Sequence, residues 1–176
     1  MKVGLFKLLQ KNNHLAQKQV FDLYAEQLFV LALRYVFNEQ DAASIVNQSF
    51  FKAFAKIKGF SNRGEGAFAA WLRQITVNES LMHLRRTKNL IFSDDENMIS
   101  SKLTEDIYCD ESITTEDCLK LLEKLPVGFR TVFNLYAIEG YSHKEIGEQL
   151  GITESASRSQ LSRARKLLQQ LILEEY

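Results

Sequence analysis

The stretch from Gly140 to Lys166, GYSHKEIGEQLGITESASRSQLSRARK, predicts two helices joined by a tight turn. Ser142 followed three residues later by Glu145 is typical of a capping box, in which each side chain hydrogen-bonds a free backbone N–H at the start of a helix. Gly151 suits the end of that helix, because glycine readily adopts the left-handed backbone conformation. The first helix has its apolar residues on one face at helical spacing, Ile146 and Leu150.

Thr153 is suited to cap the second helix, which has one apolar and one polar side. The inward side holds Leu161, Ala164, Leu168 and Leu171. The outward side holds Arg158, Gln160, Arg163 and Lys166. Such a helix fits the major groove of DNA, where Arg and Gln read base edges while Lys and Arg hold phosphates. A helical hairpin with an ordinary solvated face is the alternative, because basic residues late in a helix also complement its dipole.

The composition predicts a mostly helical, folded chain. It has 176 residues, enough for one domain or two small ones, with a single Pro and eight Gly. The hydrophobic content of 45% excludes general disorder. No apolar run approaches the ~20 residues of a membrane-spanning helix. The apolar stretch before Lys7 is too short for a secretory signal, so we expect a cytoplasmic protein without membrane insertion.

Neither a metal nor another cofactor is expected. The three His are separated from one another and from both Cys, so no metal-ligand cluster is visible. No phosphate-binding loop or nucleophile motif occurs, so no catalytic residue is assigned and no enzyme is expected. Cys109 and Cys118 lack the Cys-x-x-Cys spacing and are interpreted as free thiols, with a regulatory disulfide between them as the alternative.

The formal net charge of zero hides segments of opposite charge. Before residue 87, twelve Lys and Arg face six Asp and Glu. Residues 87–117 carry two Lys against nine Asp and Glu, a net charge of −7, so the rest of the chain carries +7. This pattern suggests contacts with nucleic acid at both ends of the chain.

The periodicity predicts an all-α fold of two small helical domains joined by a flexible acidic linker. Residues 1–86 form the first domain, a small bundle of amphipathic helices. Residues 87–113 lack sustained periodicity and form the linker. Residues 114–176 form the second domain, whose four helices include the helix-turn-helix, with Pro126 in the first turn of its second helix.

Three helices are expected in the first domain. The first runs from about residue 15 to 38. The second is capped by Asp41 and closed by Gly59. Residues 60–66 follow as a loop, because they are rich in Gly and polar residues. The third helix ends at Arg85 and Arg86.

Two groups of motifs resemble the extracytoplasmic-function (ECF) sigma factors. Residues 41–54, DAASIVNQSFFKAF, and residues 67–78, AFAAWLRQITVN, are similar to region 2 of that family. Leu125-Pro126, residues 139–147, EGYSHKEIG, and residues 161–168, LSRARKLL, are similar to region 4. The order of the motifs, the acidic linker and the length also match, so the resemblance covers nearly the whole chain.

The resemblance implies a bacterial transcription initiation factor that binds core RNA polymerase and directs it to promoter DNA. Region 4 would read the upstream, minus-thirty-five element. Region 2 would bind the polymerase clamp and melt the minus-ten element. Members of the family often have an anti-sigma factor, which the resemblance suggests as a further partner.

The resemblance also assigns three sets of site residues. The upstream-reading set is Arg158, Ser159, Gln160, Ser162, Arg163 and Lys166. The minus-ten set is Phe60, Asn62, Arg63, Arg73, Asn78, Arg85 and Arg86. Of these, Arg73, Arg85 and Arg86 would contact phosphates. The polymerase-binding set is Ser44, Asn47 and Gln48.

Some aromatic and amide residues have a purely structural alternative. Asn78 matches the Asn of the family's Ile-Ala-x-Asn motif and would hydrogen-bond the edge of a flipped base, but it can also be an amide on a helix surface. Phe60 is the candidate for stacking on an unpaired base because it lies in the loop. Phe68 and Trp71 lie at helical spacing and are expected to pack in the core.

The chain departs from the family pattern in three places. Ala156-Ser157 stands where the family commonly has Thr-Val. Residues 60–68 are slightly longer than the usual loop. The clamp motif Asp-Leu-Val-Gln-Glu is replaced by residues 44–48, SIVNQ, so polar hydrogen bonds would take the place of charge pairs. A helix-turn-helix regulator that acts without polymerase is the alternative function, and an enzyme acting on nucleic acid is disfavoured because no metal-binding carboxylate cluster appears.

Overall fold

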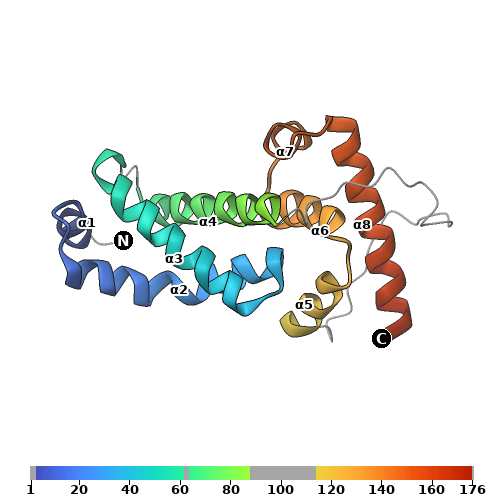
Figure 1. The fold of residues 1–176 in the computed structure, drawn as a ribbon, viewed down its shortest axis with the longest axis horizontal. Coiled ribbons are helices and arrows are strands. Elements are labelled where there is room, and N and C mark those ends of the chain that lie inside the picture. The colour runs from blue at the N-terminus through green and yellow to red at the C-terminus, as the bar shows by residue number, and fades with distance from the viewer. Residues whose placement is uncertain (1–2, 62–63, 88–113, 176) are drawn as a thin grey trace. The chain divides into compact units, whose positions relative to one another are not determined.

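The computed structural model of the chain describes residues 3–61, 64–87 and 114–175 (Figure 1). The chain divides into two units, Met1–Thr87 and Lys88–Tyr176. Every regular element of the described ranges is helical, which confirms the predicted all-α class. The predicted linker, apart from Thr87, lies outside the described residues.

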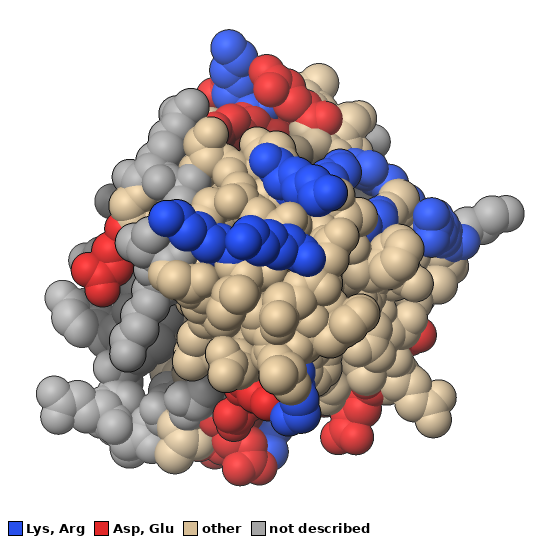
Figure 2. Space-filling model, turned by 90° about the vertical axis from the view of Figure 1, so that its left-hand side faces the viewer, with Lys and Arg blue, Asp and Glu red and all other residues tan. Residues whose placement is uncertain are grey.

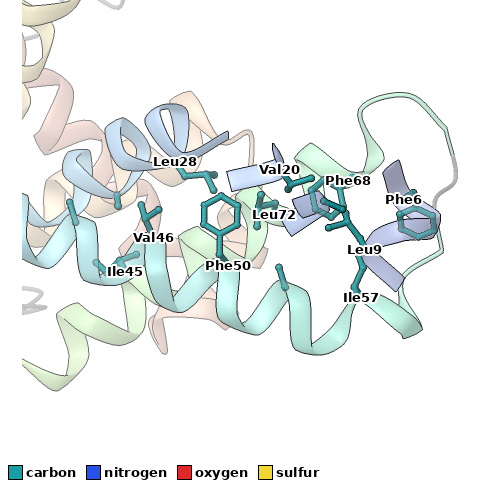
Figure 3. Packing of buried hydrophobic residues seen from close by; sticks show 14 residues of the cluster. Phe6, Leu9, Val20, Leu28, Ile45, Val46, Phe50, Ile57, Phe68 and Leu72 are labelled. Atoms are coloured by element: carbon teal, nitrogen blue, oxygen red, sulfur yellow. The ribbon is translucent and has the colours of Figure 1, made fainter. Parts of the chain in front are cut away.

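Unit 1 is a bundle of α1 (Val3–Gln10), α2 (His14–Val36), α3 (Glu39–Lys56) and α4 (Ala67–Arg86), with the 3₁₀-helical turn η1 (Ile57–Gly59) after α3. Helices α2, α3 and α4 pack against one another, and α1 lies against α2 and η1. Their apolar faces meet in one core (Figure 3). The most deeply buried side chains of this core include Leu9, Val20, Ile57 and Leu72.

Helix α1 was not expected from the sequence, which predicted no helix before about residue 15. It has eight residues, too few to be stable as an isolated helix in water. It forms because Phe6 and Leu9 are buried in the core of unit 1, with relative exposures of 9% and 0%. Tertiary packing therefore decides the structure of this segment.

Asparagine side chains begin two helices of unit 1. Asn13 Oδ1 accepts a hydrogen bond from the Ala16 N–H at 3.0 Å, and Asn38 Oδ1 accepts one from the Asp41 N–H at 2.9 Å. The prediction that Asp41 caps the second helix is therefore wrong. Phe37 follows α2 in a left-handed conformation, with φ 47°. Asn38 then caps α3, which starts at Glu39, so Asp41 lies in the first turn of α3.

An ion pair and a contact between an imidazole and a carboxylate join α3 to α4. The Lys52 ammonium lies 2.5 Å from the Glu79 carboxylate, and Nε2 of His83 lies 3.4 Å from the Asp41 carboxylate. The Ser80 hydroxyl is fully buried and donates to the Thr76 carbonyl at 2.9 Å, so this polar group is satisfied within α4. The contacts of Lys52 with Glu79 and of His83 with Asp41 link α3 to α4.

Unit 2 contains α5 (Thr115–Glu123), α6 (Val127–Phe133), the π-helical turn η3 (Asn134–Ile138), α7 (His143–Leu150) and α8 (Glu154–Glu175). Helix α8 packs against α5, α6 and α7, as expected for a four-helix unit. Pro126 immediately precedes α6 rather than lying in its first turn. The buried apolar residues include Leu125, Val132, Leu135, Ile146 and Ala164.

Arg130 is buried beneath the end of α5. Its Nη1 donates to the carbonyl oxygens of Glu123 at 3.2 Å and of Leu125 at 3.5 Å. Burial lowers the pKa of Arg130 to about 10, against the opposing effect of the Glu123 carboxylate. The guanidinium therefore stays protonated at neutral pH and satisfies carbonyl groups that the helix itself leaves without donors.

Candidate nucleic-acid interface

Helices α7 and α8 form the helix-turn-helix predicted from the sequence. The Ser142 hydroxyl accepts from the Glu145 N–H at 3.3 Å, and the Glu145 carboxylate accepts from the Ser142 N–H at 2.8 Å, so the capping box is formed. Gly151 ends α7 with φ 72°, in the left-handed region. The Thr153 hydroxyl accepts from the Ala156 N–H at 3.0 Å and caps α8. All three local predictions are confirmed.

The turn between α7 and α8 is tight because Gly147 has no side chain. Its carbonyl oxygen accepts from the N–H groups of Gly151 at 2.9 Å and Ile152 at 3.1 Å. A Cβ atom on Gly147 would lie 2.8 Å from the carbonyl oxygen of Ile152. This close approach of two backbones helps to set the angle at which α8 leaves the turn.

The outer side of α8 carries most of the predicted upstream-reading set. Arg158, Ser159 and Ser162 are exposed, whereas Arg163 and Lys166 are half-buried. The Arg158 guanidinium lies 2.5 Å from the carboxylate of Glu154, and its side chain is 64% exposed. An ion pair this exposed contributes little to stability, so Arg158 can exchange Glu154 for an acceptor on DNA.

Gln160 does not belong to this outer side. Its relative exposure is 3%, close to that of its neighbour Leu161. The expectation that Gln160 faces outward is therefore wrong. The buried side of α8 follows helical spacing but includes two polar residues, so its members are Ser157, Gln160, Leu161, Ala164 and Leu168.

His143 connects α7 to α8 behind the outer side. Its Nδ1 lies 2.9 Å from the Ser157 hydroxyl, and the residue is 8% exposed. The imidazole stacks on the Tyr136 ring, with centroids 4.4 Å apart and planes 20° apart. Arg165 lies 5.9 Å from the centroid of the same Tyr136 ring, a cation–π distance. Sequence reasoning gave His143 no role, although Ser157 had been noted as a departure from the family.

We expect unit 2 to lose stability as the pH falls below about 6.5, the usual pKa of histidine. Burial lowers the pKa of His143 most, and the positive charges of Arg158 and Arg165 lower it further. The negative charge of Glu154 acts in the opposite direction and raises this pKa. The folded state then binds fewer protons than the unfolded state. The stabilising contribution is therefore complete above the unfolded pKa and is lost as the pH falls through the folded pKa.

The measurement is the thermal unfolding midpoint of the full chain between about pH 5 and pH 8. His143→Gln removes the titrating group and keeps a side chain that can hydrogen-bond Ser157. Its midpoint should change less with pH than that of the wild-type chain. The same pH dependence in both proteins would assign the effect to another group.

Phe60 lies in an aromatic cluster of unit 1. Its ring stacks on Trp71 with centroids 4.5 Å apart and meets Phe6 and Phe68 edge-on at 5.9 Å. Phe68 is 2% exposed, which confirms that it packs in the core. An open cavity of about 720 Å³ adjoins these rings and is lined by Ala55, Lys56, Gly59, Phe60, Ser61, Ala67 and Trp71. Aromatic walls of this kind accept unpaired bases, so Phe60 stays a predicted minus-ten residue.

The other predicted minus-ten residues are spread along α4 or lie beyond the described ranges. Arg73, Asn78, Arg85 and Arg86 are exposed, and Asn62 and Arg63 fall outside the described residues. Asn78 is not among the residues that line the cavity at Phe60. The structure therefore does not bring Phe60 and Asn78 into one pocket, and a base-holding role for Asn78 stays a prediction.

Comparison with known proteins identifies the same two regions. Residues 20–89 match Sigma-70 region 2, and residues 116–168 match Sigma-70, region 4. The RNA polymerase sigma factor SigV of Bacillus subtilis (strain 168) is 30% identical over 146 residues, which cover 82% of this chain and 84% of that protein. The chain belongs to the ECF sigma factors.

Two further proteins are similar to this sigma factor and are matched over different shares of their own length. The ECF RNA polymerase sigma factor SigE of Mycolicibacterium smegmatis is 30% identical over 150 residues, which cover 82% of this chain and 57% of that protein, so the chain spans little more than half of SigE. The solved structure of the sigma factor RpoE in complex with the anti-sigma factor NepR from Bartonella quintana has a TM-score of 0.55 and 24% identity, covering 90% of this chain and 98% of that one. This structural similarity shows that the chain shares the fold of that sigma factor.

The predicted polymerase-binding residues of this sigma factor share one exposed side of α3. Ser44, Asn47 and Gln48 are exposed, whereas Ile45 and Val46 are buried at 3% and 4% exposure. This orientation is the one that helical spacing gives these five residues. Their contact with polymerase stays a prediction.

Phe51 extends this side of α3 and was missed by sequence reasoning. It lies at helical spacing from Gln48 and Asn47, and its relative exposure is 70%. The signal was its position seven residues after Ser44, which places it on the same side of the helix. A large exposed aromatic residue is typical of the residues that anchor protein–protein interfaces.

The described parts of the chain contain neither a candidate membrane span nor a metal-ligand group. No helix there is long and apolar enough to cross a membrane. No group of His, Cys, Asp and Glu in these ranges could hold a metal ion. Cys118 is exposed, and Cys109 lies outside the described residues, so the alternative of a disulfide between them is untested.

Proposed function

We propose that this sigma factor binds core RNA polymerase in the cytoplasm and directs it to a set of promoters. Helix α8 reads the minus-thirty-five element in the major groove, and the segment around Phe60 with α4 opens the minus-ten element. The observation that carries the proposal is the presence of both Sigma-70 regions in one chain, with a basic, polar side of α8 left exposed. Sigma factors are not themselves catalytic, so the chemistry belongs to the polymerase.

The two DNA contacts have different physical requirements. A duplex upstream element needs a helix that fits the major groove, with Arg158 at its base edges and further basic groups at phosphates. A melted minus-ten element needs stacking surfaces for bases that have left the duplex. The outer side of α8 supports the first contact, and the aromatic cluster at Phe60 supports the second.

The test is in vitro transcription with core polymerase over a genomic promoter library. We expect specific transcripts only when the chain and core polymerase are both present. The same promoters should bind weakly to the chain alone. Tight, specific DNA binding by the chain alone, with no transcript from any template, would instead indicate a helix-turn-helix regulator that acts without polymerase.

Restoring acidic residues to the exposed side of α3 should speed the association with core polymerase. The family's clamp motif has acids where this chain has Ser44 and Gln48, so Ser44→Asp together with Gln48→Glu adds two charges that attract basic residues on the clamp. Long-range attraction acts mainly on the association rate. We expect faster association at low salt and a steeper dependence of the association rate on salt. The rate is measured by flowing the chain over core polymerase immobilised on a sensor surface.

The matched control adds the same charge elsewhere in unit 1. Gln19→Glu with Gln27→Glu places two acids on exposed positions of α2 and should leave the association rate close to that of the wild-type chain. Slower or weaker binding of the α3 variant would show that the clamp partner of this chain differs from that of the family.

An anti-sigma partner is part of the same proposal. It is supported by the solved structure of the related sigma factor RpoE, which is bound to the anti-sigma factor NepR. Such a partner would hold this chain away from core polymerase until a signal releases it.

A further inference from the structure

Helix α1 lies outside the part of the chain that matches Sigma-70 region 2, which begins at residue 20. It is nevertheless part of unit 1, because Phe6 and Leu9 are buried in the core and the helix lies against α2 and η1. The Phe6 ring meets the Phe60 ring at 5.9 Å. Helix α1 is therefore attached directly to the aromatic cluster that the proposed function places at melted DNA.

Four exposed lysines lie on or next to α1, α3 and η1, and both α1 and α3 contact η1, which directly precedes Phe60. Lys7 lies on α1 and Lys11 directly follows it, while Lys56 ends α3 and Lys58 lies in η1. None of the four has an ion-pair partner among the described residues, and the described acid of the adjoining loop is Glu65. Figure 2 looks onto this end of unit 1 and shows Lys and Arg side chains side by side across its upper part.

The cavity of about 720 Å³ brings the aromatic and the basic groups together. Phe60 and Trp71 form its aromatic wall, and Lys56 and Ser61 add polar groups to its lining. Single-stranded nucleic acid is bound by this combination, in which aromatic rings stack on bases and basic side chains follow the phosphates. A duplex would not use it, because the base faces of a duplex are covered by their neighbours.

We propose that Lys7 and Lys11, with Lys56 and Lys58, form a surface that binds the phosphates of an unpaired promoter strand. Helix α1 thereby extends the DNA-opening side of unit 1 beyond region 2. This inference rests on the proposed function, since the unpaired strand exists only after promoter melting. Without α1 the strand would lose the contacts of Lys7 and Lys11 with its phosphates and keep those of Lys56 and Lys58.

The experiment compares full-length variants assembled with core polymerase. Lys7→Gln with Lys11→Gln removes two charges from the proposed surface. Lys18→Gln with Lys120→Gln removes two charges from exposed lysines elsewhere, on α2 and α5. The holoenzyme's affinity for a promoter fragment with a preformed minus-ten bubble is measured over a series of salt concentrations.

We expect the α1 variant to bind the bubble template several-fold more weakly at low salt. The slope of log affinity against log salt should fall by about 0.7 for each phosphate of the single strand that the variant no longer neutralises. The control variant should keep the wild-type slope, and binding of both variants to core polymerase should be unchanged. A second variant, Lys56→Gln with Lys58→Gln, removes two charges from the end of α3 and from η1. It should show the same weaker binding and smaller salt slope.

Two results would overturn this inference. An α1 variant with the salt slope of the control would show that no phosphate is held there. A drop in core affinity in place of DNA affinity would assign the surface to an acidic part of the polymerase. A failure of the wild-type chain to support any promoter-specific transcript is a separate result, because it would reject the proposed function itself.

Discussion

Replacing Arg158 with Ala is expected to weaken holoenzyme binding to the minus-thirty-five element about 5- to 150-fold, or roughly 1–3 kcal/mol for one bidentate base contact. Arg158 lies on the early turns of α8, and its side chain is 64% exposed. Its partner in the free chain is Glu154, at 2.5 Å on the same helix. Because that exposed pair is weak, DNA can displace Glu154 at small cost, and the loss falls almost entirely on DNA binding.

The measurement is the ratio of affinities for the intact and the mutated upstream element. Arg158→Lys keeps the charge but cannot make a bidentate contact, so it should retain affinity for both sequences and lose most of the discrimination. Lys120→Ala removes one charge from α5 and should leave the ratio unchanged. If Arg158→Ala weakens binding to both sequences equally, Arg158 holds a phosphate and does not read a base.

Replacing Arg130 with Met is expected to lower the free energy of unfolding of unit 2 by about 2–3 kcal/mol. Methionine retains the length and apolar stem of arginine but has no donor for the carbonyl oxygens of Glu123 and Leu125, which now accept from Nη1 at 3.2 and 3.5 Å. Removing a buried charge offsets part of this loss. The lost donor outweighs that gain, because the carbonyl group of Leu125 is buried and would be left without its arginine partner.

Hydrogen exchange of the full chain measures this effect unit by unit. Peptides from α6 and α8 should exchange faster in Arg130→Met, while peptides from α4 in unit 1 should be unchanged and serve as the internal control. Arg130→Lys keeps one donor group, so its α6 and α8 peptides should exchange at rates between those of the wild-type chain and of Arg130→Met. Protection within about 0.5 kcal/mol of the wild-type chain in α6 and α8 would mean that water replaces the guanidinium at these carbonyl groups.

Local signals carried most of what the sequence predicted correctly. The capping box of Ser142 and Glu145, the left-handed Gly151 and the Thr153 cap each depend on a few neighbouring residues, and all three are formed. The end of the third helix at Arg86 also agrees. Such signals are readable because the backbone groups that they satisfy lie within four residues.

The errors arose where contacts distant in sequence decide the structure. Helix α1 is stabilised by the burial of Phe6 and Leu9 rather than by its own propensity. Asn38 and Asp41 are both good caps, and the choice between them depends on where the preceding helix ends. Gln160 was assigned outward because it is polar, yet its side of α8 is covered by other helices. Polarity alone does not give the rotation of a helix.

The same limit applies to the site. Sequence reasoning identified the exposed side of α3, but it missed Phe51, which a strictly hydrophobic interpretation would have placed in the core. It also missed the contact between His143 and Ser157 at 2.9 Å, because the two residues lie on different helices. The turn between α7 and α8 separates them, so a helical period does not relate their positions.

The two side-chain contacts between α3 and α4 have a kinetic consequence. Lys52 with Glu79, and Asp41 with His83, couple the helix proposed to meet the polymerase to the helix proposed to meet the opened strand. Two substitutions, Glu79→Gln and Asp41→Asn, would weaken both contacts. They should slow the isomerisation from closed to open promoter at saturating sigma factor while leaving initial promoter binding intact.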